Sequence, residues 1–350
     1  MSKFFPLAIS KIENCTEESV VIVFDIHPEL TNTFCFEAGQ YITISAMIDG
    51  EEVRRAYSLC SAPYEKSIAV GVKKVEGGKM STFLNKKASI GDILQVMPPA
   101  GNFVISTDSE HNNHYVGICA GSGITPILSM IKQVMKVERS KFTLLYGNRS
   151  NSSTMFKKEL NTLLSDYPER FEIVYAFSKE MISGNIHGRL DKQNVQQFMS
   201  TRPDFRKVSA FYLCGPGEMI DQMNEILLLF NVPKSNIYFE RFTASDKASD
   251  DLSEADLVSD VTVIVDGEEF DFQLHSDDES ILDAAMSQGA DVPFSCKGGV
   301  CCVCKAKVIE GKVRMRQNFS LSEDEIEDGF VLSCQSHPES DRVVMDFDVI

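Results

Sequence analysis

The stretch Cys296-Lys-Gly-Gly-Val-Cys301-Cys302-Val-Cys304 decides the nature of the C-terminal part of this 350-residue chain. With Cys334 it gives the spacing C-x4-C-x2-C followed by x29-C, in which four thiolates hold a [2Fe-2S] cluster. The two glycines let the backbone wrap around sulfur atoms and point N–H groups at them. We therefore expect Cys296, Cys301, Cys304 and Cys334 to bind iron and Cys302 to be a spare. The alternatives are buried thiols or a zinc site, although zinc more often uses paired C-x2-C motifs or histidines.

The length and composition describe a globular chain of two or three domains, with 43% hydrophobic residues and a mean hydropathy of -0.10. We find neither an apolar run long enough for a membrane helix nor the apolar core of a signal peptide in the first ten residues, so we expect a soluble, cytoplasmic protein. In such a compartment the ten cysteines stay reduced. Four of them, outside any motif, are expected to be buried thiols without a role: Cys15, Cys35, Cys60 and Cys119.

The net charge of -17 argues against binding to nucleic acid, whose phosphates need a basic surface. The charge is uneven, because the residues from Ser259 onward include 20 acidic but only seven basic side chains. This excess has two interpretations, a solvated face that serves solubility or an electrostatic docking surface for a basic partner.

The pattern of apolar and polar residues changes along the chain. Short β-type runs in the first hundred residues predict a small antiparallel barrel. From His114 apolar strands alternate with helical segments, which is typical of a parallel sheet covered by helices. A stretch rich in Ser, Ala and Asp, Thr243–Asp256, indicates a tether. The expected elements are strands at Ser19–Ile26, Gln40–Ala46, Ser67–Val72, Tyr115–Cys119, Phe142–Tyr146, Phe171–Ala176 and Ala210–Cys214, a hairpin of Val261–Val265 and Glu268–Leu274, and a helix at Ser280–Ser287.

Two segments of the barrel region suit a dinucleotide. Arg55-Ala56-Tyr57-Ser58 combines a cation for a pyrophosphate, a ring for an isoalloxazine and a hydroxyl for its N5 edge. Gly77-Gly78-Lys79-Met80-Ser81-Thr82 is a turn that leads into an expected helix at Phe83–Lys87, and a helix N-terminus binds phosphate. Alone, the first segment would be an ordinary exposed strand.

Two loops of the α/β region suit a second nucleotide. Gly121-Ser-Gly-Ile-Thr-Pro126 lies between a strand and a helix, and its glycines allow close backbone approach to a ligand, with Pro126 expected as the first helical residue. Cys214-Gly215-Pro216-Gly217 ends another strand at the edge where such sheets bind ligands. The alternative for each loop is a plain turn between a strand and a helix.

In this order the motifs resemble the ferredoxin-NADP reductase superfamily with a C-terminal ferredoxin domain. The resemblance covers essentially the whole chain: RxYS at Arg55–Ser58, the pyrophosphate turn at Gly78–Thr82, GxGxTP at Gly121–Pro126, CG at Cys214-Gly215 and the Glu240-Arg241-Phe242 end of the reductase module. It implies an FAD-binding antiparallel β-barrel at 1–108, an NAD(P)H-binding α/β domain at 109–243, a linker at 244–258 and a β-grasp [2Fe-2S] domain at 259–350.

The same resemblance implies the roles of individual residues. Phe242 would cover one flavin face opposite Tyr57 until the nicotinamide displaces it; the alternative is a core aromatic near the linker. Residues that would shape hydride transfer are Tyr57, Ser58, Cys214 and Glu240. Residues that would bind FAD or the nicotinamide are Arg55, Tyr57, Ser58, Val72, Gly78, Lys79, Met80, Ser81, Thr82, Gly121, Gly123, Thr125, Pro126, Arg149, Cys214, Gly215 and Phe242.

Arg149 favours NADPH over NADH, because a guanidinium with Ser150, Ser152 and Ser153 suits a 2′-phosphate, and the neighbouring sequence contains no acid for a free ribose hydroxyl. The alternative is a pyrophosphate or surface role for Arg149. The resemblance implies electron transfer to an oxygenase component such as a di-iron hydroxylase. The competing hypotheses are a stand-alone NAD(P)H dehydrogenase for quinones or ferredoxin and a redox-sensing iron-sulfur regulator.

Overall fold

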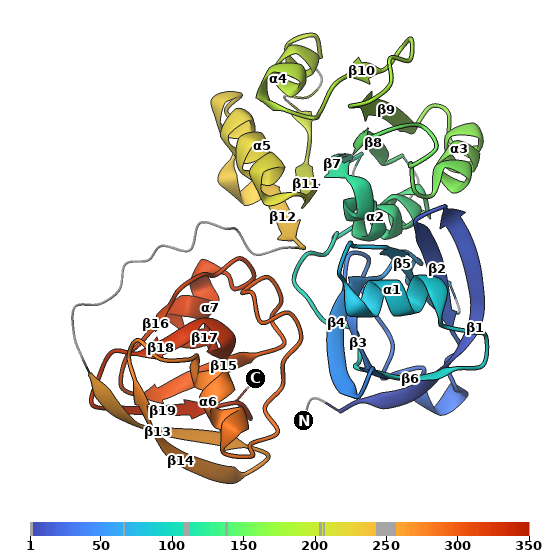
Figure 1. Ribbon diagram of the computed structural model, residues 1–350. Coiled ribbons are helices and arrows are strands. Elements are labelled where there is room, and N and C mark those ends of the chain that lie inside the picture. The colour runs from blue at the N-terminus through green and yellow to red at the C-terminus, as the bar shows by residue number, and fades with distance from the viewer. Residues whose placement is uncertain are drawn as a thin grey trace. The chain divides into compact units, whose positions relative to one another are not determined.

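The computed structural model describes residues 3–65, 67–107, 112–136, 139–202, 205, 207–242 and 257–349 (Figure 1). The chain divides into two compact units, of which one comprises Phe4–Val53 and Tyr57–Phe242 and the other is built mainly from the described residues after Phe242. The expected tether Thr243–Asp256 lies outside the described residues. In the described part of the chain, no helix has the length and apolar character needed to cross a bilayer.

The first unit begins with an antiparallel barrel. Its six strands follow the order β4-β3-β6-β1-β2-β5, and a bridge between Leu59 and Val70 joins the two outer strands. Alternating residues point inward, so Ile22, Ile42 and Ile44 are fully buried. The elements are β1 (Phe5–Thr16), β2 (Ser19–Phe24), η1 (Pro28–Leu30), β3 (Tyr41–Ile48), β4 (Glu51–Ser58), β5 (Ile68–Lys73), α1 (Lys79–Lys86) and β6 (Ile93–Val96).

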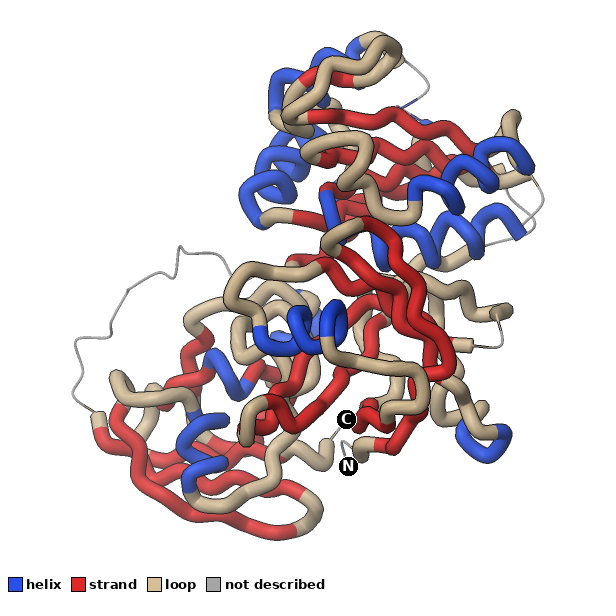
Figure 2. The backbone as a smooth tube through the Cα atoms, turned by 45° about the vertical axis from the view of Figure 1, so that its right-hand side comes forward, coloured by secondary structure: helices blue, strands red, loops and turns tan. Residues whose placement is uncertain are grey.

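The second part of this unit is a parallel sheet in the order β10-β9-β8-β7-β11-β12, with helices on both faces (Figures 1 and 2). Because the strands are parallel, their carboxyl ends share one edge, where β7, β8 and β11 lead into loops. The elements are β7 (His114–Ala120), η2 (Gly121–Gly123), α2 (Ile124–Lys136), β8 (Lys141–Asn148), α3 (Lys157–Asp166), β9 (Phe171–Phe177), β10 (Ile186–His187), α4 (Lys192–Ser200), β11 (Ala210–Gly215), α5 (Gly217–Leu229), η4 (Lys234–Asn236) and β12 (Ile237–Arg241).

The second unit is a mixed five-stranded sheet, β14-β13-β19-β15-β17, beside the short pair β16-β18. The parallel pairing of β13 with β19 joins the first and last strands of the domain. Asp266 and Gly267 both have positive φ, which is the turn that two-residue hairpins favour. The elements are β13 (Val258–Val265), β14 (Glu268–His275), α6 (Ile281–Ser287), β15 (Lys305–Glu310), β16 (Val313–Met315), α7 (Glu323–Glu327), β17 (Phe330–Leu332), η5 (Ser333–Gln335), β18 (Ser336–Pro338) and β19 (Arg342–Asp346).

The expected strands and the hairpin are present, with ends that differ by one to three residues, but two helix starts were wrong. The helix expected at Phe83 already begins at Lys79, because Gly78 has extended backbone and serves as its N-cap. Helix α2 begins at Ile124, so Pro126 is its third residue and not its first. The first turn of a helix tolerates proline, because N–H groups there have no helical acceptor.

Candidate active site and cluster site

Three residues far apart in the sequence meet where the barrel adjoins the parallel sheet. Ser58, the last residue of β4, donates a hydrogen bond from Oγ to Glu240 Oε2 at 2.9 Å. Glu240 lies on β12 directly beside Cys214 on β11. The structure thus brings together three of the four residues that the sequence assigned to hydride transfer; Tyr57 precedes Ser58 on the same strand and packs against the barrel core.

The environment of these residues keeps their protons in place at neutral pH. Burial of the carboxyl raises the pKa of Glu240 to about 8, against a smaller opposing effect of the Ser58 hydrogen bond. Burial also raises the pKa of the Cys214 thiol, and the nearby Glu240 adds to that rise. The site therefore presents a neutral carboxyl, a hydroxyl and a thiol, so it can hold or move one proton without an unbalanced buried charge.

The two glycine-rich loops of the nucleotide domain touch each other. A Cβ on Gly123 would lie 2.2 Å from the carbonyl oxygen of Cys214, so only glycine allows this approach. Thr125 fixes the same loop from within, because its Oγ1 donates to Ser122 O at 3.0 Å. The loops predicted separately from the sequence are thus two walls of one site.

One cation, Lys73, lies beside the GSG loop, and a second, Arg149, lies near Lys73. Gly121 has φ of +56°, its carbonyl accepts a bond of 2.9 Å from Tyr146 OH, and a Cβ on it would lie 3.8 Å from Lys73 Nζ. Burial, followed by the charge of Arg149, lowers the pKa of Lys73. The sequence pointed to Arg149 but not to Lys73; the only signal was a lysine at the end of a strand, and its nearness to Arg149 emerges only in the fold.

The expectation that no acid lies near Arg149 was wrong. Glu180 Oε2 accepts a hydrogen bond from Asn151 N at 2.7 Å, and Lys179 N donates to Arg149 O at 2.8 Å. The loop after β9 thus packs on the loop after β8, and it brings a carboxylate from 31 positions along the chain to the side of Arg149. Exposed Arg149 and half-buried Glu180 border the same loop with opposite charge.

The residues expected around the flavin lie on β4, β5 and α1 and just after β12. Gly78 caps α1 without a side-chain hydrogen bond, so N–H groups of its first turn remain open to an anion. Ser81 instead supports the turn, because its Oγ accepts from Val75 N and donates to Gly78 O. Lys79 forms an ion pair with Glu51. The others are exposed Arg55, part-buried Thr82, core residues Met80 and Val72, and Phe242, which is 37% exposed just after β12.

The four predicted ligand thiols lie in two pairs. Cys301 and Cys296 are joined by a sulfur–sulfur hydrogen bond of 3.1 Å, which helps lower the pKa of Cys296 to about 6. The thiols of Cys304 and Cys334 form a second hydrogen-bonded pair. Among the described side chains, no three His, Cys, Asp or Glu converge as they would on one metal ion. Two pairs match the needs of two bridged irons better than those of one zinc ion.

The backbone of the loop between these cysteines directs N–H groups at sulfur atoms. Gly298 N donates to Cys296 Sγ at 3.3 Å, and Gly299 N hydrogen-bonds to the Cys334 thiol. Gly299 has φ of +70°, and a Cβ there would lie 3.1 Å from Gln317 O. Cys302 points elsewhere, because its thiol donates to Ser320 O at 3.2 Å. The thiols and amides therefore fit a [2Fe-2S] cluster, with Cys302 outside the ligand set.

The cysteines outside the motifs form no disulfide, and two of them contradict the sequence prediction. Cys60 and Cys119 are buried as expected, but Cys15 is only partly buried and Cys35 is exposed. Cys15 Sγ accepts a hydrogen bond from Phe156 N at 3.0 Å, so it helps join the barrel to the nucleotide domain.

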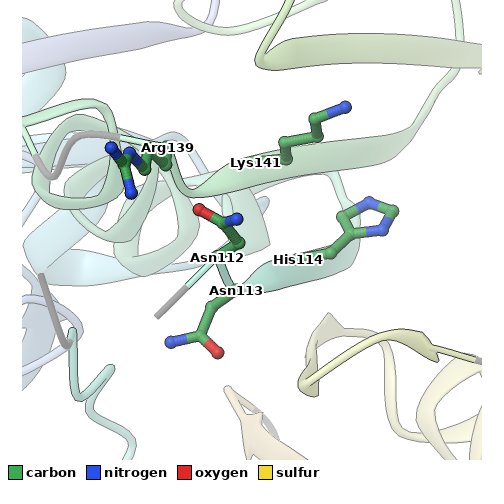
Figure 3. A pocket seen from close by; sticks show the side chains of 5 residues that line it. All are labelled: Asn112, Asn113, His114, Arg139 and Lys141. Carbon is green, nitrogen blue, oxygen red and sulfur yellow. The ribbon is translucent and has the colours of Figure 1, made fainter. Parts of the chain in front are cut away.

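A hollow of about 320 Å³ lies at the opposite, amino-terminal ends of β7 and β8 (Figure 3). Asn112, Asn113, His114, Arg139 and Lys141 line it. Figure 3 shows the Arg139 and Lys141 side chains pointing away from each other, and His114 Nε2 is engaged with Thr143 Oγ1 at 2.9 Å. These groups do not converge on a common point, so the hollow is not part of the candidate site.

Comparison with known families agrees with this organisation. The chain matches the oxidoreductase FAD-binding domain over residues 6–105, the oxidoreductase NAD-binding domain over 118–225 and the 2Fe-2S iron-sulfur cluster binding domain over 263–339. The chain belongs to the family of modular reductases that combine these three domains, and it is an oxidoreductase.

Individual relatives narrow this class. The chain is 40% identical to a subunit of 1,2-phenylacetyl-CoA epoxidase from Escherichia coli K12, over 99% of both chains. It is 31% identical to the ferredoxin reductase component of 3-ketosteroid-9-alpha-monooxygenase from Rhodococcus rhodochrous, over 97% of this chain and 96% of the other. Phthalate dioxygenase reductase has the same fold, with a TM-score of 0.61 over 98% of both chains at 24% identity.

Proposed function

We propose that this chain accepts hydride from NADPH on bound FAD and passes the electrons singly, through a [2Fe-2S] cluster on its C-terminal domain, to an oxygenase component. FAD, when bound, supplies the conversion from two-electron to one-electron chemistry. The observation that carries the proposal is the presence, in one chain, of the Ser58–Glu240–Cys214 constellation and of two thiol pairs cradled by backbone amides. The domain limits 1–108, 109–243, 244–258 and 259–350 belong to the same proposal.

Residues of the barrel and of the parallel sheet would bind and orient the nucleotides. The open N–H groups of α1 from Gly78 to Thr82, together with Arg55, would hold the FAD pyrophosphate, and Tyr57 and Phe242 would cover opposite faces of its ring. The Ser58 hydroxyl would hydrogen-bond the reacting edge of that ring. The neutral Glu240 would keep a proton behind Ser58, and Cys214 would border the nicotinamide.

Phosphate recognition on the nicotinamide side would fall to Lys73 and Arg149. Lys73 lies close enough to Gly121 to meet a pyrophosphate there, and Arg149 is exposed beside Ser150, Ser152 and Ser153. We propose NADPH as the donor. Glu180 opposes that choice, but its carboxylate already accepts the Asn151 amide hydrogen, which reduces its capacity to accept from a ribose hydroxyl.

The choice of nucleotide is tested by two single changes. Arg149→Ala should raise the KM for NADPH roughly tenfold and leave the KM for NADH nearly unchanged, because it removes a cation that only a 2′-phosphate requires. Glu180→Gln keeps the shape of the loop and removes its negative charge, so the KM for NADPH should fall slightly. A wild-type preference for NADH, lost in Glu180→Gln, would reverse the assignment.

The proposed acceptor is the oxygenase component of a phenylacetyl-CoA epoxidase, a di-iron hydroxylase. The support is the likeness, at 40% identity over 99% of both chains, to a subunit of such an epoxidase. The similarity to a 3-ketosteroid monooxygenase reductase component makes another oxygenase the second candidate. Docking would use the acidic C-terminal domain, where Glu323, Asp324, Glu327 and Asp328 are exposed on and just after α7.

The decisive experiment is the visible spectrum of the purified protein with iron, sulfide and flavin analysis. We expect one FAD, two irons and two sulfides per chain, with flavin and cluster bleaching together on addition of NADPH. A protein that contains zinc and no inorganic sulfide would overturn the proposal. Electron transfer to candidate hydroxylases, measured at increasing salt concentration, then tests the partner. Its rate should fall as salt screens an electrostatic docking interaction. None of the described cysteines forms a disulfide, which supports the proposed cytoplasmic location.

A further inference from the structure

Two serines occupy matching places in the cluster site. Ser295 directly precedes Cys296, and Ser333 directly precedes Cys334, so each lies next to a cysteine of a different thiol pair. Both are buried, with exposed fractions of 2% and 0%. They are small polar residues in equivalent sequence positions, and they would be expected to have equivalent roles.

Their hydroxyls differ in one respect. Ser333 Oγ donates a hydrogen bond to the backbone carbonyl of Cys304 at 2.9 Å. Ser295 Oγ is buried and has no hydrogen-bond partner among the described residues. A buried hydroxyl without a partner is unfavourable, because it has lost its bonds to water and gained none. Ser295 therefore needs an acceptor that the polypeptide does not supply.

The neighbouring backbone indicates what that acceptor is. The amides of Gly298, Val300 and Cys301 hydrogen-bond to Cys296 Sγ, and the amide of Gly299 to Cys334 Sγ. The donors of this loop are thus directed at sulfur, and Ser295 is the residue attached to the first of these thiols. We propose that the Ser295 hydroxyl donates a hydrogen bond to a sulfur atom at the Cys296–Cys301 end of the [2Fe-2S] cluster and thereby raises the reduction potential of the cluster.

This inference rests on the proposed function, because it requires the cluster to be bound. Reduction adds one negative charge to the cluster, and a hydroxyl dipole aimed at sulfur stabilises the reduced form more than the oxidised form. Loss of the hydroxyl should therefore make the cluster harder to reduce and leave more of the electrons on the flavin. The Ser333 hydroxyl already donates to the Cys304 carbonyl, so Ser333 should contribute to the stability of the folded domain and not to the reduction potential of the cluster.

The test compares Ser295→Ala with Ser333→Ala in the full-length, cluster-loaded protein. The reduced cluster is measured by electron paramagnetic resonance during a redox titration. At the wild-type midpoint, the ratio of oxidised to reduced cluster should rise roughly fivefold in Ser295→Ala, the factor equivalent to one ordinary hydrogen bond. Ser333→Ala should keep the wild-type midpoint and lower the melting temperature. An unchanged midpoint in Ser295→Ala, as when an ordered water satisfies the hydroxyl, overturns the inference.

Further variants cover the case in which Ser295→Ala does not assemble the cluster. Ser295→Gly removes the same hydroxyl without leaving a methyl group, and its midpoint is judged in the same way. If neither variant loads, Ser295→Thr decides: normal loading and a wild-type midpoint support the hydroxyl, and failure overturns the inference. A wild-type protein without iron and sulfide would contradict the proposed function itself, which is a separate and earlier result.

Discussion

The two candidate sites of this chain are assembled in opposite ways. Three of the four cluster thiols come from nine consecutive residues, Cys296–Cys304, and the loop that carries them also supplies the amides directed at sulfur. The hydride site instead joins Ser58 to Glu240 across 182 positions and depends on the pairing of β11 with β12. One site is a property of a loop, and the other is a property of the packed fold.

The difference determines how each site should fail. Removal of one thiol eliminates an iron ligand but leaves the hydride site untouched, because the two lie in separate compact units. A change that separates the GSG loop from the CG loop should damage nucleotide binding and leave the cysteines in place.

The largest expected effect is that of Cys334→Ser. It removes the ligand that comes from outside the loop, so the cluster should be lost or incomplete, and NADPH-dependent reduction of cytochrome c should fall by roughly 100-fold or more. Reduction of the flavin by NADPH, followed in a stopped-flow spectrometer, should keep its wild-type rate.

The matched control is Cys302→Ser, which alters a cysteine in the same loop that is bonded to Ser320 O and not to its fellow thiols. It should retain both the cluster spectrum and cytochrome c reduction. An equal loss of the cluster spectrum in the two variants would contradict the assignment of Cys296, Cys301, Cys304 and Cys334 as the ligand set.

The next largest effect is that of Gly123→Ala on the nucleotide site between the GSG loop and the CG loop. A methyl group 2.2 Å from Cys214 O forces the two loops apart, so the KM for NADPH should rise at least about tenfold, while the cluster spectrum is unchanged. Gly184→Ala is the control in the same domain, because φ of +81° gives it backbone strain of about 1 kcal/mol but no atom within 4 Å obstructs its Cβ. Similar KM values in the two variants would contradict a specific role for the close approach of Gly123 to Cys214 O.

The contrast also explains what the sequence could predict. Cysteine spacing is local information, so the ligand set follows from residues 296–334 without knowledge of the fold. Motif loops such as Gly121–Pro126 are recognisable one at a time, but Lys73 and Glu180 became visible only when strands distant in sequence were placed side by side. The early start of α1 at Lys79 was missed because a capping glycine and a turn glycine look alike in sequence. Exposure of Cys35 likewise depends on tertiary context, which no local pattern contains.

A smaller, pH-dependent effect should identify Glu240. Its pKa in the folded chain, about 8, lies above the ordinary value of 4.5, so the folded state retains a proton that the unfolded state releases. Wild-type stability should therefore decline as pH rises from 4.5 to 8, by on the order of 2–3 kcal/mol at pH 7, and Glu240→Gln should abolish that decline. Flavin reduction by NADPH should change through an apparent pKa near 8 in the wild type and not in Glu240→Gln.

Thermal unfolding at about pH 6 and about pH 8.5 measures the first effect, and stopped-flow reduction measures the second. Ser58→Ala is the informative companion, because it removes the hydrogen bond to Glu240 but leaves the carboxyl buried, so its pH dependence should persist with a higher apparent pKa. A wild-type protein with flat profiles in both measurements would contradict the assignment of a buried, protonated Glu240.

The smallest expected effect concerns a residue outside the cysteine loop that contributes to the stability of the cluster domain. His337 on β18, paired with Arg314 on β16, is buried, and desolvation followed by the charges of Arg316 and Arg314 lowers its pKa to about 4, against a weak opposing effect of Asp277. Because the folded pKa lies below the unfolded value of 6.5, the contribution of neutral His337 is present above pH 6.5 and is lost as pH falls toward 4. Between about pH 7 and about pH 5.5 the domain should lose about 1 kcal/mol of stability, measured by urea unfolding followed through the cluster absorbance. His337→Gln should remove that loss, and His275→Gln, a change at an exposed histidine on β14, should not. If His337→Gln retained the full pH dependence, the loss of stability could not be assigned to the buried, neutral His337 on β18.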